Sequence, residues 1–184
     1  MSGVAHDYLK YVSSMQSASL QDLMREYGTE VWNYAFLLTK SRHVSDDIAQ
    51  DVFLQAYLHI SSFRGQSSVR TWLFTITRNR VINYKRSAFF RKVTLLDFLY
   101  QAPSVPSAEE QFMKRTYTDS IWESIMKLPP KYREVLLMDA QYEMPLAEIA
   151  QLLRVSIGTV KSRLHRARAK MRTLMEEAES VEGS

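Results

Sequence analysis

Hydrophobic residues recur at intervals of three and four along most of the chain, the spacing that places side chains on one face of an α-helix. The first series predicts an amphipathic helix that buries Leu20, Leu23, Met24, Tyr27, Val31, Tyr34, Ala35 and Leu38. The second series predicts a helix that buries Ala49, Val52, Phe53, Ala56 and Ile60. The alternation typical of strands does not occur, so the predicted fold class is all-α.

Polar residues predict where these helices begin. Ser45 is expected to be the N-cap of the second helix, because Asp46 and Asp47 would then follow in the first turn, where the helix dipole favours anions. A third helix is expected from about Thr71 to about Ser87, with Leu73, Ile76 and Tyr84 buried. Pro130 suits the first turn of a later helix, which is expected to bury Tyr132, Val135 and Leu136.

The helical pattern is interrupted between residues 89 and 110. Pro103 and Pro106 lie there in a Ser- and Ala-rich stretch, which is typical of a linker. An apolar patch at residues 95–100 either packs on one of the domains or is covered by a partner. We therefore expect two small helical domains joined by a linker: an N-terminal extension (1–17), a helical domain (18–88), the linker (89–110), a second helical domain (111–176) and an acidic tail (177–184).

The clearest motif is a helix-turn-helix between residues 145 and 172. It lies in the second of the two expected domains. Its short first helix buries Leu146, Ile149, Ala150 and Leu153. Ser156 is placed to cap the next helix, whose buried stripe is Val160, Leu164, Ala167, Met171 and Leu174. The turn after Leu153 favours glycine in the left-handed conformation, yet Arg154 stands there. We expect a small strain cost at Arg154 or a turn that closes at another residue.

Cations gather on the second helix of this motif. Six of the twelve residues from 161 to 172 are Lys or Arg, although the net charge of the chain is only +4. Such a helix fits the major groove of DNA, with Lys161, Ser162, His165 and Arg166 on its outer face. Arg166 can donate two hydrogen bonds to a guanine, worth about 1–3 kcal/mol of discrimination. Phosphate contacts are expected from Arg163, Arg168 and Arg172. The alternative is a helical hairpin with a solvated basic face.

The first domain carries two further candidate surfaces. Asp47, Asp51, Leu54 and Leu58 align opposite the buried stripe of the second helix. Acids mixed with exposed leucines suit a protein partner, unless another helix of the domain buries the leucines. The second surface joins a polar loop at residues 63–68 to Asn79, Asn83 and Arg86 on one edge of the third helix. Amides beside cations can read unpaired bases, whereas the alternative is a solvated helix surface.

Composition excludes several classes of function. The chain has no cysteine, so disulfides, thiol nucleophiles and the common zinc-finger spacings are absent. The four histidines are scattered and the five glycines form no phosphate loop. No apolar run is long enough for a signal peptide or a membrane span. We therefore expect a cytoplasmic protein that is not an enzyme, needs no cofactor or metal, takes no small-molecule substrate and does not insert into membranes.

Three stretches of the chain, at residues 46–53, 71–86 and 148–164, resemble one family in order and spacing. They are similar to the extracytoplasmic-function (ECF) group of sigma factors, the smallest members of the sigma-70 family. The resemblance spans roughly residues 18–176. It implies a factor that binds core RNA polymerase and directs promoter recognition, promoter melting and transcription initiation, for a stress or envelope-response regulon. An anti-sigma protein is implied as a further partner.

The resemblance also implies roles for individual residues. The surface that docks on the clamp helices of the polymerase largest subunit is matched by Asp47, Gln50, Asp51 and Leu54. The part that captures a flipped base and single strand of the −10 element is matched by Arg64, Gly65, Gln66, Ser67, Ser68, Asn79, Asn83 and Arg86. The recognition helix for the −35 element is matched by Lys161, Ser162, Arg163, His165 and Arg166.

A transcriptional regulator that binds duplex DNA without being a polymerase subunit is the main alternative. Residues 155–164 also resemble the DNA-binding domain of response-regulator-type activators, so the last third of the chain does not decide between the two. The first domain distinguishes a sigma factor from such a regulator, because a regulator of this kind has no need to read a melted strand.

Overall fold

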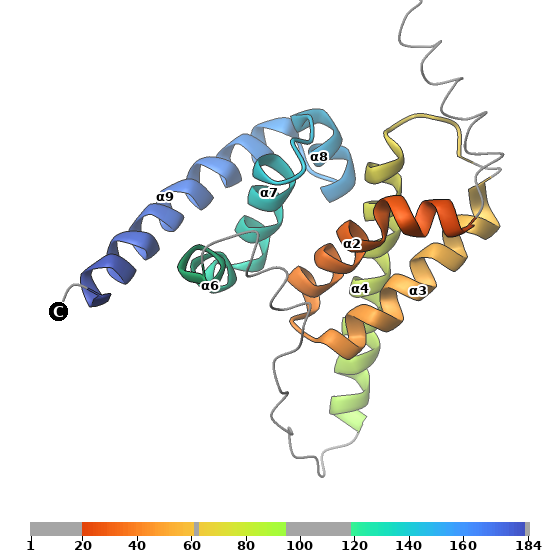
Figure 1. Cartoon of the computed structure of the whole chain (residues 1–184), viewed down its shortest axis with the longest axis horizontal. Helices are drawn as coiled ribbons and strands as arrows, with labels where there is room; N and C mark the ends of the chain where they lie inside the picture. The colour runs from red at the N-terminus through yellow and green to blue at the C-terminus, as the bar shows by residue number, and fades with distance from the viewer. Residues whose placement is uncertain (1–19, 61–62, 95–118, 183–184) are drawn as a thin grey trace, which may run out of the picture. The chain divides into compact units, whose positions relative to one another are not determined.

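The computed structural model describes residues 20–60, 63–94 and 119–182, and within these ranges the chain is helical and contains no strand (Figure 1). It divides into two compact units, Met1–Arg91 and Lys92–Ser184. The helices are α2 (Leu20–Thr39), α3 (Arg42–His59), α4 (Val69–Thr94), α6 (Asp119–Lys127), α7 (Pro130–Ala140), α8 (Leu146–Leu153) and α9 (Ile157–Glu182). The prediction of an all-α fold with two helical modules is confirmed.

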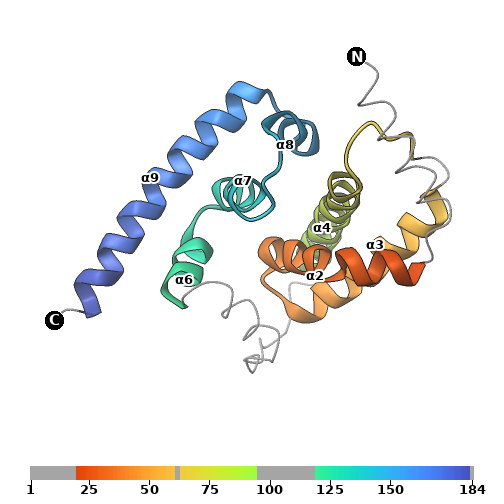
Figure 2. The same cartoon turned by 45° about the horizontal axis from the view of Figure 1, so that its top comes forward.

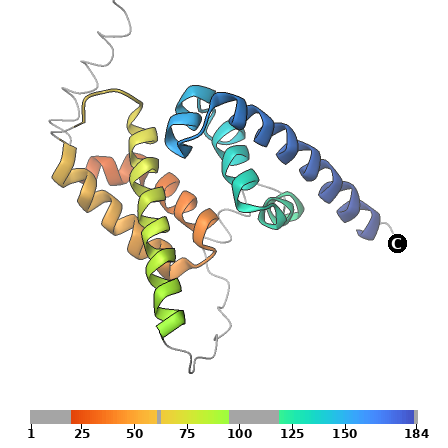
Figure 3. The ribbon, with the colours of Figure 1, turned by 180° about the vertical axis from the view of Figure 1, so that it is seen from behind.

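In the first unit, α2 and α3 lie against each other and α4 packs across them (Figures 1 and 3). The core combines the apolar stripes of all three helices, and its members include Leu23, Val31, Ala35, Ile48, Val52, Phe53, Ala56, Leu73 and Val81. Tyr34 and Phe74 stack beside them with ring centroids 4.7 Å apart. Burial of these side chains is the main force that holds α4 on the other two helices.

Two residues of the stripes predicted for the first unit are exposed. Met24 on α2 is 46% exposed and Tyr84 on α4 is 39% exposed. The prediction that Tyr84 is buried was wrong, because α4 extends beyond the helices that it covers. Residues 82–87 are all exposed after the buried Val81. Met24 lies beside the stripe formed by Leu23 and Val31 rather than within it.

The start of α3 lies earlier than predicted. Ser41, with an extended backbone, is the N-cap, so Ser45 lies inside the helix and the prediction of a cap at Ser45 was wrong. The Ser45 side chain is fully buried and its hydroxyl donates to the Ser41 carbonyl at 2.7 Å. Asp46 is therefore not in the first turn, and instead accepts a 2.6 Å hydrogen bond from the indole of Trp32 on α2.

Two helices continue into segments predicted as irregular. α4 runs to Thr94, so residues 89–94 of the expected linker are helical. α9 runs to Glu182, so most of the expected acidic tail belongs to this helix. The remainder of the linker, with its apolar patch, lies outside the described residues, as does the N-terminal extension. The domain boundaries and the roles given to the domains stay predictions.

In the second unit, α6, α7 and α8 pack on the long helix α9 (Figure 2). Pro130 occupies the first turn of α7, as predicted. Tyr132 and Val135 are buried, but Leu137 takes the buried position expected of Leu136. Leu136 is half-buried because it lines a shallow apolar depression beside α9.

A buried arginine fixes the turn between α6 and α7. Arg133 is only 4% exposed and donates hydrogen bonds to the carbonyls of Met126 (3.1 Å) and Leu128 (3.0 Å). These carbonyls lie at the end of α6, where the helix leaves acceptors without partners. Burial lowers the pKa of the Arg133 guanidinium. The charged guanidinium therefore joins α6 to α7 and is not available on the surface.

Candidate nucleic-acid interfaces

The turn of the helix-turn-helix closes at Arg154. This residue has φ 56° and ψ 48°, the left-handed conformation. Its backbone N–H donates to the Gln151 carbonyl at 3.2 Å, and that of Val155 donates to the Ala150 carbonyl at 3.0 Å. The predicted strain at this position is therefore present, at roughly 1–2 kcal/mol for a residue with a Cβ atom. The other possibility, a turn closed at a different residue, is wrong.

Ser156 caps α9, as predicted. Its hydroxyl oxygen accepts a 3.1 Å hydrogen bond from the backbone N–H of Thr159 and lies 2.9 Å from the Thr159 hydroxyl. The cap satisfies a donor that the first turn of the helix would otherwise leave open. Together with the turn at Arg154, it fixes the direction in which α9 leaves α8.

The first turns of α9 separate a buried stripe from an exposed one. Val160, Leu164 and Ala167 are buried, whereas the predicted recognition face is exposed at Lys161, Ser162, His165 and Arg166. Arg163 lies at the edge and is half-buried. The Ser162 hydroxyl donates to the Thr159 carbonyl at 3.0 Å, so it keeps only acceptor capacity for a ligand. The contact of this face with bases in a groove stays a prediction.

Arg168, expected on phosphate, is engaged within the unit. Its guanidinium donates to the carboxylate of Asp139 on α7 at 2.6 Å. Arg172 lies one turn further on and lines the apolar depression between α7 and α9. The partner of Arg168 could not be predicted from the sequence, because Asp139 lies on another helix and nothing in the local pattern marks it.

The α3 outer face consists of Asp47, Gln50, Asp51, Leu54, Tyr57 and Leu58. Leu54 and Leu58 are 51% and 58% exposed, so none of the described helices of the unit covers them, contrary to the alternative of buried leucines. Tyr57 is equally exposed and was missed, although its position three residues after Leu54 marks it as a neighbour. Exposed apolar side chains beside two carboxylates are typical of a surface that binds a protein.

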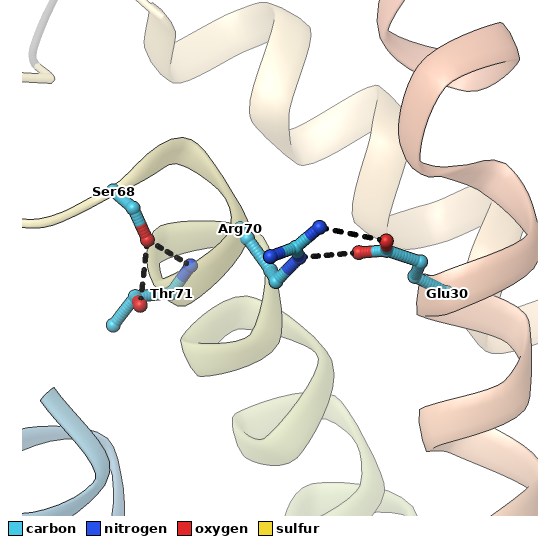
Figure 4. A network of polar contacts seen from close by, with 4 residues as sticks. All are labelled: Glu30, Ser68, Arg70 and Thr71. Carbon is cyan, nitrogen blue, oxygen red and sulfur yellow. Dashed lines mark hydrogen bonds and ion pairs between the residues drawn. The ribbon is translucent and has the colours of Figure 1, made fainter. Parts of the chain in front are cut away.

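Contacts within the start of α4, and one from α4 to α2, fix the position where the polar loop ends (Figure 4). Ser68 caps α4 through its hydroxyl, which accepts from the Thr71 N–H at 3.2 Å and lies 2.8 Å from the Thr71 hydroxyl. Arg70 donates two hydrogen bonds, of 2.6 and 2.9 Å, to the two carboxylate oxygens of Glu30. Gly65 adopts a positive φ of 65°, which glycine tolerates without strain. Of the other candidates in the loop, Arg64 and Gln66 are exposed and Ser67 is half-buried.

Two predicted base-reading residues share a pocket between α3 and α4. The α4 pocket has a volume of about 270 Å³ and is lined by Gln55, His59, Trp72, Ile76, Asn79, Arg80 and Asn83. Asn79 and Asn83 thus come together, beside an indole on which a base can stack. Arg86 is exposed further along the helix, and it and the loop candidates are not among the lining residues. Gln55, His59, Trp72, Ile76 and Arg80 were missed as pocket residues.

Arg80 also forms an ion pair with the α3 outer face. Its Nε atom lies 3.0 Å from Oδ2 of Asp51. The sequence gives little sign of this pair, because 29 positions and the polar loop separate the two residues. The two candidate surfaces of the first unit therefore share a contact.

Within the described residues, no cluster of three or more His, Asp or Glu side chains is arranged to hold a metal ion. None of the helices in the described ranges combines the length and the apolar character needed to cross a membrane.

Comparison with known proteins identifies the family of this chain. Residues 23–89 match the sigma-70 region 2 model and residues 118–171 match the sigma-70 region 4 model. The chain is 32% identical to RNA polymerase sigma factor YlaC of Bacillus subtilis, over 89% of this chain and 96% of the relative. It is 30% identical to ECF RNA polymerase sigma factor SigM of the same organism, over 85% and 94% of the two chains.

Solved structures share the fold. The sigma factor RpoE of Bartonella quintana, solved with the anti-sigma factor NepR, gives a TM-score of 0.68 at 22% identity, over 85% of this chain and 95% of that one. CnrH, solved with the cytosolic domain of CnrY, gives 0.63 at 23% identity, over 90% and 95%. The fold and the helix-turn-helix define a two-module DNA-binding protein. The chain belongs to the sigma-70 family of RNA polymerase sigma factors, and within it to the ECF group.

Proposed function

We propose that this protein binds core RNA polymerase and directs it to promoters, where it recognises the DNA, helps to open it and so starts transcription. The observation that carries the proposal is the pairing of a region 2 module and a region 4 module in one chain. The polymerase carries out the chemistry, and the protein acts without a cofactor or a small-molecule substrate of its own. We place it in the cytoplasm, where the polymerase and the chromosome are.

The second unit is proposed to read the −35 element as duplex DNA. Support comes from the capped start of α9 and from the exposed side chains of Lys161, His165 and Arg166 on its first turns. A recognition helix places these turns against the edges of bases in the major groove. Arg163 at the edge of the face is proposed to hold the backbone.

The first unit is proposed to serve the −10 element and the polymerase. Asn79 and Asn83 line a pocket of suitable polarity for an unpaired base, with Arg86 and the loop residues Arg64, Gly65, Gln66, Ser67 and Ser68 proposed along the single strand. The α3 outer face, with Asp47, Gln50, Asp51 and Leu54, is proposed to dock on the clamp helices of the polymerase. Membership in the ECF group supports an anti-sigma protein as a further partner.

The decisive experiment adds the purified chain to core polymerase and genomic DNA and sequences the transcripts that start. We expect a defined set of start sites that share upstream elements and are absent with core polymerase alone. A protein that binds duplex promoter DNA tightly but never associates with core polymerase would instead be a regulator. That alternative is not favoured, because residues 23–89 match a module that a duplex-only regulator does not need.

Asn79→Ala tests the proposed base pocket. We expect it to weaken promoter opening about ten-fold while polymerase binding is retained, because loss of contacts to one base costs on the order of 1 kcal/mol or more. Opening is measured by permanganate reactivity of the melted bases, and polymerase binding by titration of labelled protein. Equal loss of both activities would count against base capture by Asn79.

A further inference from the structure

One ion pair joins the α3 outer face to the α4 pocket. Asp51 belongs to the face proposed to dock on the polymerase, and its Oδ2 atom lies 3.0 Å from Nε of Arg80. Arg80 lines the pocket together with Asn79 and Asn83. This contact thus connects the residues proposed for the polymerase with those proposed for the melted strand.

Both members of the pair remain open to other partners. The side chain of Asp51 is 42% exposed and that of Arg80 is 34% exposed, so each reaches solvent while in contact with the other. A phosphate that approached Arg80 would also approach the Asp51 carboxylate, and like charges repel. In the free protein, therefore, Asp51 offsets the attraction of Arg80 for a nucleic-acid backbone.

We propose that Arg80 is a further strand-binding residue and that Asp51 restrains it until the α3 outer face docks on the polymerase. A donor of the polymerase that binds the Asp51 carboxylate weakens its hold on the guanidinium. Arg80 then binds a phosphate of the opened strand beside the base in the α4 pocket. This inference rests on the docking role proposed above for the α3 outer face.

Polymerase binding and strand binding are then thermodynamically coupled. Each ligand strengthens the binding of the other by the same factor, because the two share one competing contact. Ion pairs that are exposed to this degree contribute modestly, so we expect a coupling of about two- to five-fold in the binding constant. Such a factor favours strand capture by the polymerase-bound protein over the free protein.

The first test uses the full chain without polymerase and a short labelled oligothymidine, because a phosphate contact does not depend on base sequence. Asp51→Asn keeps the shape of the side chain and removes its charge, and we expect it to bind the strand about two- to five-fold more tightly than the wild type. Glu26→Gln is the matched control, since Glu26 is an exposed acid on α2 of the same unit. Far-UV circular dichroism checks that both variants are folded.

The double variant Asp51→Asn/Arg80→Ala shows whether the effect passes through Arg80. We expect no gain from Asp51→Asn when Arg80 is absent. The inference is overturned if Asp51→Asn binds the strand no better than Glu26→Gln, or if the gain persists in the Arg80→Ala background.

The second test separates this inference from the proposed function. We expect Asp51→Asn to weaken binding to core polymerase, measured by titration of fluorescently labelled protein. If it leaves polymerase binding unchanged but strengthens strand binding, the docking role of Asp51 and the coupling are overturned, while its restraint of Arg80 stands. If the wild type fails to bind core polymerase, the proposed function itself fails, whatever the result with oligothymidine.

Discussion

The two units position their candidate DNA-binding residues by different means. In the second unit the supports are local, because Arg154 closes the turn and Ser156 caps the helix that bears the recognition face. In the first unit the supports join distant parts of the chain. Glu30 on α2 holds Arg70 at the start of α4, and Asp51 on α3 holds Arg80. One continuous stretch builds the helix-turn-helix, whereas the α4 pocket forms only when separate helices of the first unit pack together.

The cations of the two units also differ in whether they have acidic partners. Among the described residues, Lys161 and Arg166 on the recognition face pair with no acid. Arg70 and Arg80 in the first unit are each held by a carboxylate. With the roles proposed above, the recognition face offers these cations to duplex DNA, whereas Arg80 of the α4 pocket is balanced by the Asp51 carboxylate.

Arg166→Ala is expected to give the largest effect. If Arg166 reads a guanine, its loss lowers discrimination at one position of the upstream element by about 1–3 kcal/mol. Competition binding with a set of single-base variants of the duplex measures this discrimination. A uniform loss of affinity across all sequences would instead identify Arg166 as a phosphate contact.

Glu30→Gln tests the long-range support in the first unit. The Glu30 and Arg70 side chains are both half-buried, so loss of the charged pair is expected to cost about 1 kcal/mol of stability and to loosen the loop that ends at Ser68. Urea unfolding measures the stability, and promoter opening reports the loop. The control is Asp22→Asn, which removes the carboxylate of the more exposed pair with Arg25 on the same helix. An equal effect of both changes would contradict a special role of Glu30.

Ser156→Ala tests the local support in the second unit. Loss of the helix cap is expected to cost about 1 kcal/mol of stability, measured by urea unfolding. Ser162→Ala is the matched control, since its exposed hydroxyl bonds only within the helix, to the Thr159 carbonyl. We expect a clearly smaller change for the control. If the two variants are equally stable, the cap does not fix the start of α9.

Arg154→Gly is expected to give the smallest effect, with the opposite sign. Glycine relieves the left-handed strain but loses more conformational freedom on folding, so the net gain in stability is about 0.5–1 kcal/mol. Thermal unfolding measures the gain. A loss of stability would show that the Arg154 side chain makes a contribution that outweighs its strain.

The sequence predicted best what depends on neighbours along the chain. The apolar stripes of α2, α3 and α9, the turn at Arg154 and the cap at Ser156 all follow from local spacing. The start of α3 was missed because the Ser45 hydroxyl bonds backward within the helix, an option that the pattern of serine and aspartates does not reveal. The α4 pocket and its ion pair were missed because tertiary packing alone brings α3 and α4 together there.

Arg133 limits where the chain can be cut to prepare a fragment of the second unit. Its guanidinium is enclosed by the second unit and donates to the carbonyls of Met126 and Leu128. A fragment that begins at α7 would keep the helix-turn-helix but would remove both carbonyl acceptors of Arg133 and uncover the side chains that α6 covers on α9. The helix that precedes Pro130 is therefore part of the packing that holds α7 and α9, and a fragment of the second unit has to include it.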